Sequence, residues 1–495
     1  MSNITRRSFL QKGTAAAAAL TIVPSAVLGK SHGHTAPTDK LNIAGVGIGG
    51  MGNANLKNME TTENIVALCD IDWKYSKPVF DRHPQAKKYW DYRKMYDEMG
   101  KSIDAVLVAT ADHTHAMITA DAMTLGKHVY TQKPLTHSVY ESRLLTNLAK
   151  KYDVATQMGN QGSSWDGTAT VCDWIWNGEI GDVYKVECAT DRPIWPQGLN
   201  APEKVDKIPS TLNWDLFTGP AKLRPFNKTY HPWNWRGWWD YGTGALGDMA
   251  CHILHPVFKG LNLGYPTRVQ GSSTLLLQDC APNAQHVKLV FPARDNMPKV
   301  AMPEVEVHWY DGGMMPDRPE GFPQGKELMG EGGGLCIFHG TKDTLICGCY
   351  GVNPWLLSGR KPNVPQTLRR VKDAMKGGHE QDWIRACKES AGSRVQTKSN
   401  FLEAGPFNEM VVMGVLAVRL QRLNKELLWD GPNMRFTNID PNETIKIIKK
   451  DTFEVIDGDP KFKTEWTDPI NAQEFAAGLI KHNYREGWKL VDMPR

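Results

Sequence analysis

Asp248 and His252 are the residues whose types and spacing point most directly to chemistry. They lie in GTGALGDMACHILHP, residues 242–256, which also carries three glycines and His255. On a helix, a separation of four residues puts both side chains on one face, one turn apart. Such a pair could move a proton, hold a metal ion together with His255, or only cap and pack the helix. A metal site would need further ligands or water, and we expect none.

A glycine-rich turn near the start of the chain suggests a second kind of chemistry. The apolar strand LNIAGV runs into a loop with Gly45, Gly47 and Gly50 in the pattern G-x-G-x-x-G. Glycines let the backbone approach a pyrophosphate, and the first amides of the next helix stabilise its charge. The next predicted strand, IVALCD, ends at Asp70, where a carboxylate can bind the adenosine ribose hydroxyls. Because Asp70 would repel a 2′-phosphate and no arginine follows it directly, the sequence favours NAD over NADP.

The elements that position this loop alternate between strand and helix as far as residue 160. Strands are predicted at 103–110, 127–134 and 154–161, and helices at 92–100, 115–126 and 138–151. Repeated units of this length predict a doubly wound parallel sheet, whose ligands bind at the carboxyl ends of the strands. His113 and His115 could equally be ordinary loop histidines. The cofactor candidates beyond the G-x-G-x-x-G glycines and Asp70 are Gly49, Met51, Thr110, His113, His115, Gln132, Lys133 and Asn160.

Tryptophan is frequent outside the predicted nucleotide domain, above all in HPWNWRGWWDYG, residues 231–242. Large flat side chains can stack on the C–H faces of a sugar ring, although most of them will be structural. The substrate-contact candidates are Arg192, Trp195, Trp235, Trp238, Tyr241 and His255. Alternating patterns predict strands at 287–293, 305–313 and 335–350, with helices at 379–390 and 406–424. The Lys-rich stretch 442–468 is predicted to be a surface insertion.

The first 36 residues are predicted to be an export signal and linker. TRRSFLQKG places two arginines before an Ala-rich apolar stretch and resembles a twin-arginine (Tat) signal. The stretch is too short to span a bilayer well, so we expect a periplasmic protein without stable membrane insertion. Its nine cysteines should be buried free thiols, because export by this route follows folding in the reducing cytoplasm. A net charge of +4 with scattered basic residues gives no footprint for nucleic acid.

Five segments in order carry a resemblance to a known family. They are the glycine motif of Gly45 to Gly50, VATADHTHA, KHVYTQKPLTH, IGDVYKV and GTGALGDMACH. This order resembles the Gfo/Idh/MocA family of glucose-fructose oxidoreductases and inositol dehydrogenases. The resemblance implies an α/β fold: an N-terminal Rossmann domain, placed at 37–160, and a C-terminal α/β domain with a large open, mainly antiparallel sheet, placed at 161–495. It also implies a homo-oligomer, a dimer or a tetramer.

The resemblance assigns roles to three residues. The family's Glu-Lys-Pro matches at Lys133 and Pro134, with Gln132 in place of the glutamate, which leaves open how the lysine is held. Lys133 would stand beside the nicotinamide and the reacting oxygen, and His252 would take the hydroxyl proton. Asp248 would orient His252 or bind a sugar hydroxyl. Alcohol oxidation does need a base with a pKa near neutrality and a cation that stabilises a developing alkoxide. The alternatives are a surface lysine, a helix cap and a packed core histidine.

The function expected from these features is oxidation of a sugar or glycoside hydroxyl, preferably at C3, by NAD that stays bound. An exported enzyme cannot draw on cytoplasmic NAD, so hydride must pass to a second sugar or another acceptor. One alternative is an NAD-dependent glycosidase that oxidises C3 transiently, eliminates and re-reduces. Another is a non-catalytic sugar-binding protein that keeps the nucleotide fold.

Overall fold

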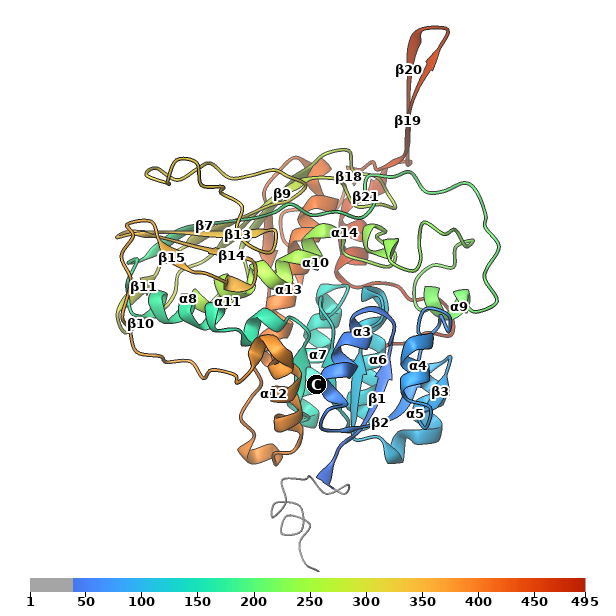
Figure 1. The fold of residues 1–495 in the computed structure, drawn as a ribbon. Helices are drawn as coiled ribbons and strands as arrows, with labels where there is room; N and C mark the ends of the chain where they lie inside the picture. Colours follow the sequence, from blue (N-terminus) through green and yellow to red (C-terminus); the bar gives the residue numbers. More distant parts are fainter. Residues whose placement is uncertain (1–38, 495) are drawn as a thin grey trace, which may run out of the picture.

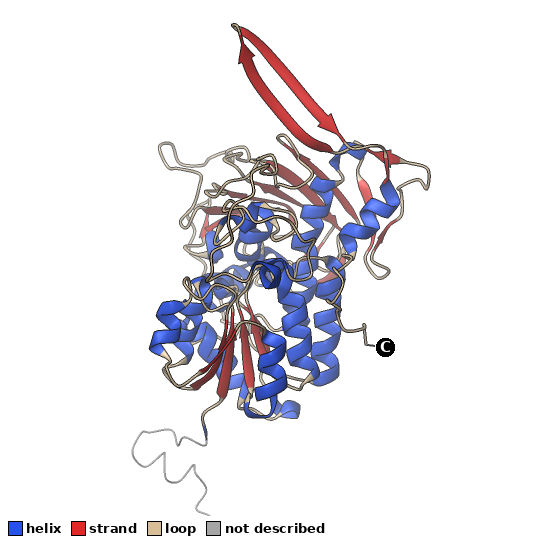
Figure 2. Cartoon of the chain, turned by 90° about the vertical axis from the view of Figure 1, so that its right-hand side faces the viewer, coloured by secondary structure: helices blue, strands red, loops and turns tan. Residues whose placement is uncertain are grey.

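The computed structural model describes residues 39–494, so the predicted export signal lies outside the described residues. The first domain is a six-stranded parallel sheet with helices on both sides (Figures 1 and 2). Its strand order is β3-β2-β1-β4-β5-β6. The order reverses between β1 and β4, which makes their carboxyl ends a ligand-binding crevice. The strands are β1 (Asn42–Val46), β2 (Asn64–Cys69), β3 (Lys87–Tyr89), β4 (Ala105–Val108), β5 (His128–Thr131) and β6 (Thr156–Met158).

Local sequence explains why the helices of this domain form where they do. Ser138 caps α7 and forms a capping box with Glu141, whose carboxylate accepts the Ser138 amide at 3.0 Å. Asp91 caps α5 by accepting the amide of Arg93 at 2.9 Å. Each side chain satisfies amides that the first helical turn leaves without partners. The helices are α3 (Gly50–Met59), α4 (Lys77–Arg82), α5 (Tyr92–Met99), α6 (Asp112–Thr124) and α7 (Val139–Tyr152).

The second domain contains a nine-stranded sheet in the order β15-β14-β13-β7-β12-β9-β8-β16-β17. β7 and β12 run parallel, and the other neighbouring pairs run antiparallel. The predicted fold class is therefore confirmed. The strands are β7 (Val183–Thr190), β8 (Arg268–Ser273), β9 (Gln285–Phe291), β12 (Val305–Tyr310), β13 (Gly334–Gly340), β14 (Thr344–Gly348), β15 (Trp355–Leu356), β16 (Leu427–Asp430) and β17 (Arg435–Phe436).

Helices α10 and α13 pack between this sheet and the first domain (Figure 1). Of the described helices, α13 is the one whose length and composition would allow it to cross a membrane, and 83% of its apolar window is buried. It packs on α7 of the first domain as well as on β8, so it is a core helix shared by both domains. The helices of the second domain are α8 (Asp166–Trp176), α9 (Trp214–Thr218), α10 (Gly244–Ile253), α11 (His255–Gly260), α12 (His379–Cys387), α13 (Phe401–Arg419) and α14 (Ala472–Ile480).

Two late segments return to the first domain. Helix α12 packs on its parallel sheet, where Trp383 is fully buried beside Tyr130 and its indole donates to the carbonyl of Ala155 at 3.3 Å. The C-terminal tail follows α14 and runs beside α7, where Asn147 donates to the sulfur of Met493 at 3.3 Å. Figure 1 shows the C terminus against the first domain. The chain therefore crosses between its two domains several times.

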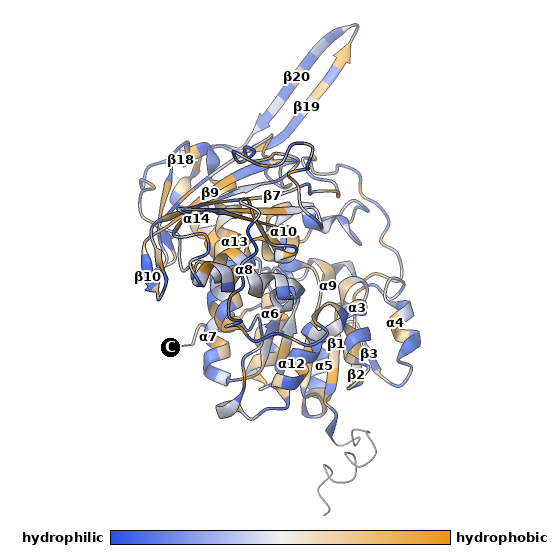
Figure 3. Ribbon diagram, turned by 60° about the vertical axis from the view of Figure 1, so that its left-hand side comes forward, coloured by the Kyte–Doolittle hydropathy of each residue, from blue (hydrophilic) through white to orange (hydrophobic). Residues whose placement is uncertain are grey.

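Strands β19 (Ile448–Ile456) and β20 (Asp459–Trp466) form a hairpin that projects from the second domain (Figure 1). Figure 3 shows hydrophobic and hydrophilic positions interspersed along it, and Phe453 and Phe462 pack on each other while both stay exposed. This is the segment predicted to be a surface insertion. The remaining short strands are β10 (Arg294–Met297), β11 (Val300–Met302), β18 (Thr444–Ile445) and β21 (Ile470–Asn471).

All nine cysteines are buried and unpaired, as the sequence predicts.

Candidate active site

A cleft between the two domains is lined by half of the predicted residues. Its first-domain wall is the carboxyl edge of the parallel sheet, where Gly47 follows β1, Asp70 follows β2, Thr110 follows β4 and Lys133 follows β5. Its second-domain wall is the segment 231–236 together with Leu216 and Phe217. The order of the strands in the sheet therefore fixes the order along the cleft, with Asp70 towards one end and Lys133 towards the other.

The glycine loop has no room for a side chain at Gly47 or Gly52. Gly47 has φ +76°, and a Cβ there would lie 2.6 Å from the backbone of Ala109 and Thr110. A Cβ on Gly52 would lie 2.0 Å from the carbonyl of Gly47, whereas Gly50 would meet only the hydroxyl of Tyr75, at 3.1 Å. Gly52, rather than the third motif glycine Gly50, therefore makes the close contact between helix α3 and the loop. Gly45, Gly49, Gly50 and Met51 complete the loop, and the last three line the cleft.

This loop is a suitable cradle for a dinucleotide pyrophosphate. Helix α3 begins after Gly49 without a side-chain cap, so its first amides are free to bind an anion. Asp70 holds the loop by accepting the amide of Ile48 at 2.8 Å, and also accepts that of Asp72 at 2.9 Å. Burial raises the pKa of Asp70, and these hydrogen bonds oppose the rise. The described residues therefore fit the cofactor that the motif predicts.

The remaining cofactor candidates divide into cleft residues and supporting residues. Thr110, His113 and Gln132 line the cleft. His115 lies behind it, with its ring nitrogens 2.8 Å from the carbonyl of Pro134 and 3.1 Å from that of Thr110. Burial lowers the pKa of both His113 and His115 to about 4, so both are neutral supports. The Asn160 amide nitrogen reaches the carbonyl of Cys251 at 3.3 Å, while its carbonyl oxygen is buried without a protein partner.

Lys133 is held by Asp248. This contact explains how the lysine is held although Gln132 replaces the glutamate of the family motif. The Lys133 Nζ donates to Asp248 Oδ1 at 2.6 Å and to the Asp248 carbonyl at 3.3 Å. The Gln132 side chain donates to Asn55 at 2.8 Å and accepts the backbone amide of Lys133 at 3.3 Å, so it does not bind the lysine ammonium. The two catalytic candidates from different domains therefore form one ion pair across the cleft.

Arg236 is a third member of this cluster. Its Nε donates to the same Asp248 Oδ1 at 3.1 Å. The guanidinium is fixed between two indoles, 3.9 Å from the ring centroid of Trp233 and 4.3 Å from that of Trp235. Burial alone would raise the pKa of Asp248, but Lys133 and then Arg236 outweigh burial and hold that pKa well below its usual range. Asp248 is therefore a permanent anion that positions two cations.

His252 differs from its prediction in two ways. Asp248 forms no hydrogen bond with it within residues 39–494, because the carboxylate faces Lys133 and Arg236 instead, and His252 Nδ1 is buried without a partner. Burial and then the charge of Lys133 lower the pKa of His252 to about 3 rather than leaving it near neutrality. The imidazole is thus neutral and able to accept a proton, and Asp248 does not orient it.

Tyr350 packs against His252 and was not singled out by the sequence. Its ring lies 4.7 Å from the His252 ring in an edge contact and 4.6 Å from that of Trp165. The residue has φ +63°, an uncommon conformation for a side chain of this size, and Thr168 Oγ1 donates to its carbonyl at 3.1 Å. Burial raises the pKa of Tyr350 to about 12, so its hydroxyl stays protonated beside His252.

Four of the six predicted substrate residues are structural instead. Trp195 donates to Gln197 at 2.9 Å, and Trp238 donates to the carbonyl of Thr229 at 3.1 Å. Tyr241 is fully buried in the aromatic cluster around Trp214, and His255 contacts Glu403 at 2.9 Å. These side chains bury apolar area or neutralise a partner, so none of them offers a free face. The corrected residues are Trp195, Trp238, Tyr241 and His255.

The other two substrate candidates, Trp235 and Arg192, remain connected with the site. Trp235 lines the cleft, but one of its faces is occupied by Arg236. Arg192 pairs with Asp191, and its charge lowers the pKa of Tyr350, against the larger effect of burial. The sequence missed Arg236, Trp233 and His231 on the cleft wall, although all three lie in the Trp-rich run that it singled out.

Two family models match the chain. One is described as the oxidoreductase family GFO_IDH_MocA, NAD-binding Rossmann fold, and matches residues 41–160. The other is described as the C-terminal alpha/beta domain of the oxidoreductase family and matches residues 193–279. The first match contains the glycine loop, Asp70 and Lys133, and the second contains Arg236 and Asp248. The two matches together supply both walls of the cleft.

Known proteins resemble parts of the chain. Glycosyl hydrolase family 109 protein 1 of Akkermansia muciniphila is 32% identical over 119 residues, 21% of this chain and 23% of that protein. Inositol 2-dehydrogenase of Salmonella typhimurium is 27% identical over 141 residues, 28% of this chain and 41% of that protein. The chain therefore matches less than half the length of either relative.

Solved structures resemble a larger part of this chain than these relatives do. WlbA dehydrogenase from Bordetella pertussis, in complex with NADH and UDP-GlcNAcA, superposes with a TM-score of 0.52 at 14% identity. The superposition covers 79% of this chain and 99% of that one. The likeness confirms the two-domain fold.

Proposed function

Because the chain belongs to the Gfo/Idh/MocA oxidoreductase family, we propose that it is an NAD-dependent oxidoreductase acting on a hydroxyl of a sugar or glycoside. The observation that carries the proposal is the ion pair of Lys133 and Asp248 at 2.6 Å, placed at one end of a cleft that also contains a dinucleotide cradle. Relatives named as inositol and levoglucosan dehydrogenases support a cyclic polyol or sugar as substrate.

The glycine loop and Asp70 would hold the cofactor, with NAD favoured over NADP because Asp70 would repel a 2′-phosphate. When bound, NAD supplies a two-electron acceptor for the hydride of an alcohol carbon. The protein's part is to position the alcohol and manage its proton. The Lys133 ammonium, held by Asp248, stabilises negative charge on the substrate oxygen.

His252 is the proposed acceptor of the hydroxyl proton. Burial and Lys133 lower the pKa of its imidazole, so the ring is neutral before the reaction, as a proton acceptor must be. Protonated His252 would be a strong acid in this environment, so the proton returns readily when the reaction runs towards the alcohol. Asp248 and Arg236 hold the lysine in place and do not themselves exchange protons.

We propose further that oxidation occurs at C3, that NAD stays bound between turnovers, and that a second sugar or another acceptor removes the hydride. The resemblance of residues 1–36 to a twin-arginine signal supports a periplasmic site of action, where free NAD is scarce. We also retain the proposal of a dimer or tetramer, for which family membership is the support.

A second candidate is a glycosidase that uses bound NAD transiently. The name of the Akkermansia muciniphila relative favours it. Incubating the purified protein with nitrophenyl glycosides, without added NAD, separates the two. Accumulation of a ketosugar supports the dehydrogenase, and steady release of nitrophenol supports the hydrolase. Bound NAD with neither product would indicate a sugar-binding protein and would contradict the proposal.

A further inference from the structure

We propose that the C-terminal tail, residues 481–494, is part of the cofactor site: Trp488 covers the adenine end of the dinucleotide and slows its release. This rests on the proposed function, because it takes NAD to be the occupant of the cleft. Neither family model reaches the tail, since their matches end at residue 279. The inference therefore concerns a residue outside both matches.

The position of Trp488 follows from the strand order. Asp91 follows β3, which is the strand next to β2 and its Asp70. With pyrophosphate at the glycine loop and adenosine ribose at Asp70, the base extends away from Lys133 and towards Asp91. The cleft wall at that end contains Trp90, Asp91, Tyr92, Leu216, Phe217 and Trp488. An indole there can stack on a nucleobase.

Trp488 is fixed from the first domain. The Arg93 guanidinium lies 4.3 Å from its ring centroid and reaches the carbonyl of Gly487 at 3.4 Å. Asp91 in turn holds Arg93, at 2.7 Å and 3.0 Å. A cation on one face of an indole leaves the other face able to stack. The ring is therefore preorganised, which reduces the entropy lost when a base binds.

The tail is also tied to the second domain, so it bridges the cleft. The Arg485 amide donates to the carbonyl of Pro220 at 2.9 Å, and its guanidinium donates to the carbonyl of Gly219 at 3.0 Å and to Asp215 at 2.5 Å. Further back, the Tyr484 hydroxyl donates to Glu141 of α7 at 2.7 Å. Releasing the tail would break contacts to both domains at once.

A second connection closes the neighbouring stretch of the cleft. The Trp73 amide donates to the carbonyl of Thr211 at 2.9 Å, and the Asn213 amide donates to that of Ile71 at 2.8 Å. His231 contacts Asp72 at 3.0 Å. These bonds join the loop after Asp70 to the second domain, so the ribose end is bridged as well. Opening this end requires separation of the two domains.

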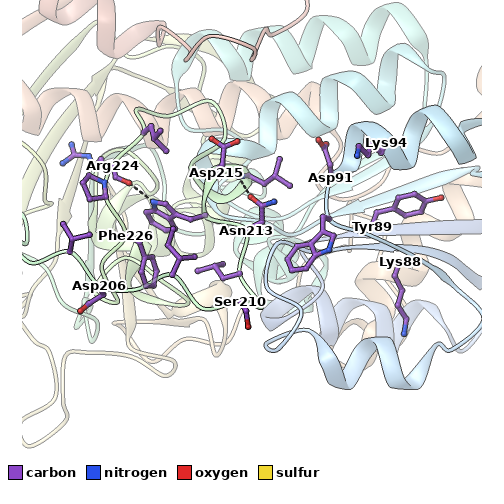
Figure 4. A pocket seen from close by; sticks show the side chains of 18 of the residues that line it. Lys88, Tyr89, Asp91, Lys94, Asp206, Ser210, Asn213, Asp215, Arg224 and Phe226 are labelled. Atoms are coloured by element: carbon purple, nitrogen blue, oxygen red, sulfur yellow. Dashed lines mark hydrogen bonds between the residues drawn. The ribbon is translucent and has the colours of Figure 1, made fainter.

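Solvent reaches the cleft at this end. A surface groove shares Trp90 and Asp91 with the cleft. Figure 4 shows its walls, with Asp91 and Lys94 from the first domain and Asn213, Asp215 and Arg224 from the second. Trp488 lines the cleft beside this junction, where a dinucleotide base would otherwise be open to water.

The test measures release of NADH, whatever the substrate is. The full-length protein is loaded with NADH and chased with excess NAD, and the loss of bound NADH fluorescence gives the release rate. We expect Trp488→Ala to release NADH about tenfold to a hundredfold faster, as for loss of one stacked base. Trp488→Phe should restore most of the retention. Arg485→Ala should show a smaller increase, because it loosens the tail and keeps the ring.

The matched control is Trp466→Ala. Trp466 is also an indole beside an arginine, 4.4 Å from Arg422, but it is exposed and lies on the projecting hairpin. It should release NADH at the wild-type rate. Thermal unfolding without cofactor should be alike for all variants. If a folded, NADH-loaded Trp488→Ala variant releases NADH at the wild-type rate, this inference is wrong, while the proposed function is not affected. A wild-type protein that takes up no NADH would overturn the proposed function with it.

Discussion

The two ends of the cleft are lined by different kinds of side chain. At one end, Lys133, Asp248 and Arg236 meet within 3.1 Å, and the rings of Trp233 and Trp235 serve to fix one of these charges. At the other end, the wall is mostly aromatic and apolar, with Trp90, Phe217 and Trp488. A charged side chain stabilises a developing charge strongly only when a few ångströms separate the two. Retention of a nucleobase depends instead on the apolar area that it buries. The comparison indicates that one end performs the reaction and the other retains the cofactor.

Lys133→Ala should have the largest difference in effect between the two ends of the cleft, because it should impair the reaction and leave cofactor binding intact. Loss of the cation should lower the rate of hydride transfer by about 10²–10³-fold. The cofactor should still bind, because the glycine loop, Asp70 and Trp488 are untouched. Single-turnover reduction of bound NAD by a nitrophenyl glycoside that the wild type oxidises measures the first effect, and NADH titration measures the second.

The control is Lys150→Ala, an exposed lysine in the last turn of α7. Its transfer rate should equal that of the wild type. Normal hydride transfer in Lys133→Ala would remove the proposed chemistry from this end of the cleft.

Gly47→Ala should damage the middle of the cleft and therefore both ends. A positive φ costs an L-residue about 1–2 kcal/mol. The new Cβ would also lie 2.6 Å from the backbone of Ala109 and Thr110. We expect lower thermal stability and loss of NADH binding. Gly126→Ala isolates the backbone cost, because Gly126 has φ +70° and nothing within 4 Å of its Cβ position. Equal NADH affinity in the two variants would contradict the cradle.

Arg236→Ala tests whether Asp248 needs its second cation. Asp248 would keep Lys133, but the lysine would be less firmly placed, and misplacement costs up to about a hundredfold in rate. Release of NADH should not change. Arg236→Lys keeps the charge and loses the planar stack between the two indoles, so it should recover only part of the rate. Arg435→Ala removes an exposed arginine of β17 and serves as the control. An unchanged rate in Arg236→Ala would limit the reactive cluster to Lys133 and Asp248.

The smallest expected effect concerns the charge of His252. Burial and Lys133 lower its pKa to about 3, so the imidazole should stay neutral between about pH 5 and pH 8, where an ordinary histidine titrates. Ring ¹³C shifts of histidine-labelled protein, with His252→Asn to assign the signal, measure this directly. A titration midpoint near 6.5 would show that His252 is solvated and not part of a closed site.

The sequence predicted the first domain well because its signals are local. The alternation of strands and helices depends on neighbours a few residues away, and the six-stranded parallel sheet confirms it, although its strands are shorter than predicted. The open sheet of the second domain came from resemblance rather than from periodicity. The third motif glycine was assigned by spacing to Gly50, whereas the structure gives the close contact to Gly52, because backbone proximity is set by the tertiary fold.

The candidate site was predicted in part, and the errors share a cause. Tyr241 and Trp238 were chosen because aromatic residues suit sugars, but aromatic residues suit cores equally well, and both are buried. His255 was chosen for its place beside Asp248, yet its partner Glu403 lies 148 residues further along the chain. Arg236 was missed because its role depends on two indoles and on a carboxylate that folding brings to it. The lowered pKa of His252 depends on burial, which no spacing reveals.

The central claim is that this cleft holds a dinucleotide between a retaining end and a reactive end. Denaturing the protein as isolated and analysing the released small molecules by mass spectrometry tests it most directly. We predict release of NAD in stoichiometric amount from the wild type, and from Lys133→Ala as well. A protein that releases no dinucleotide and takes up none from excess NAD would contradict the claim.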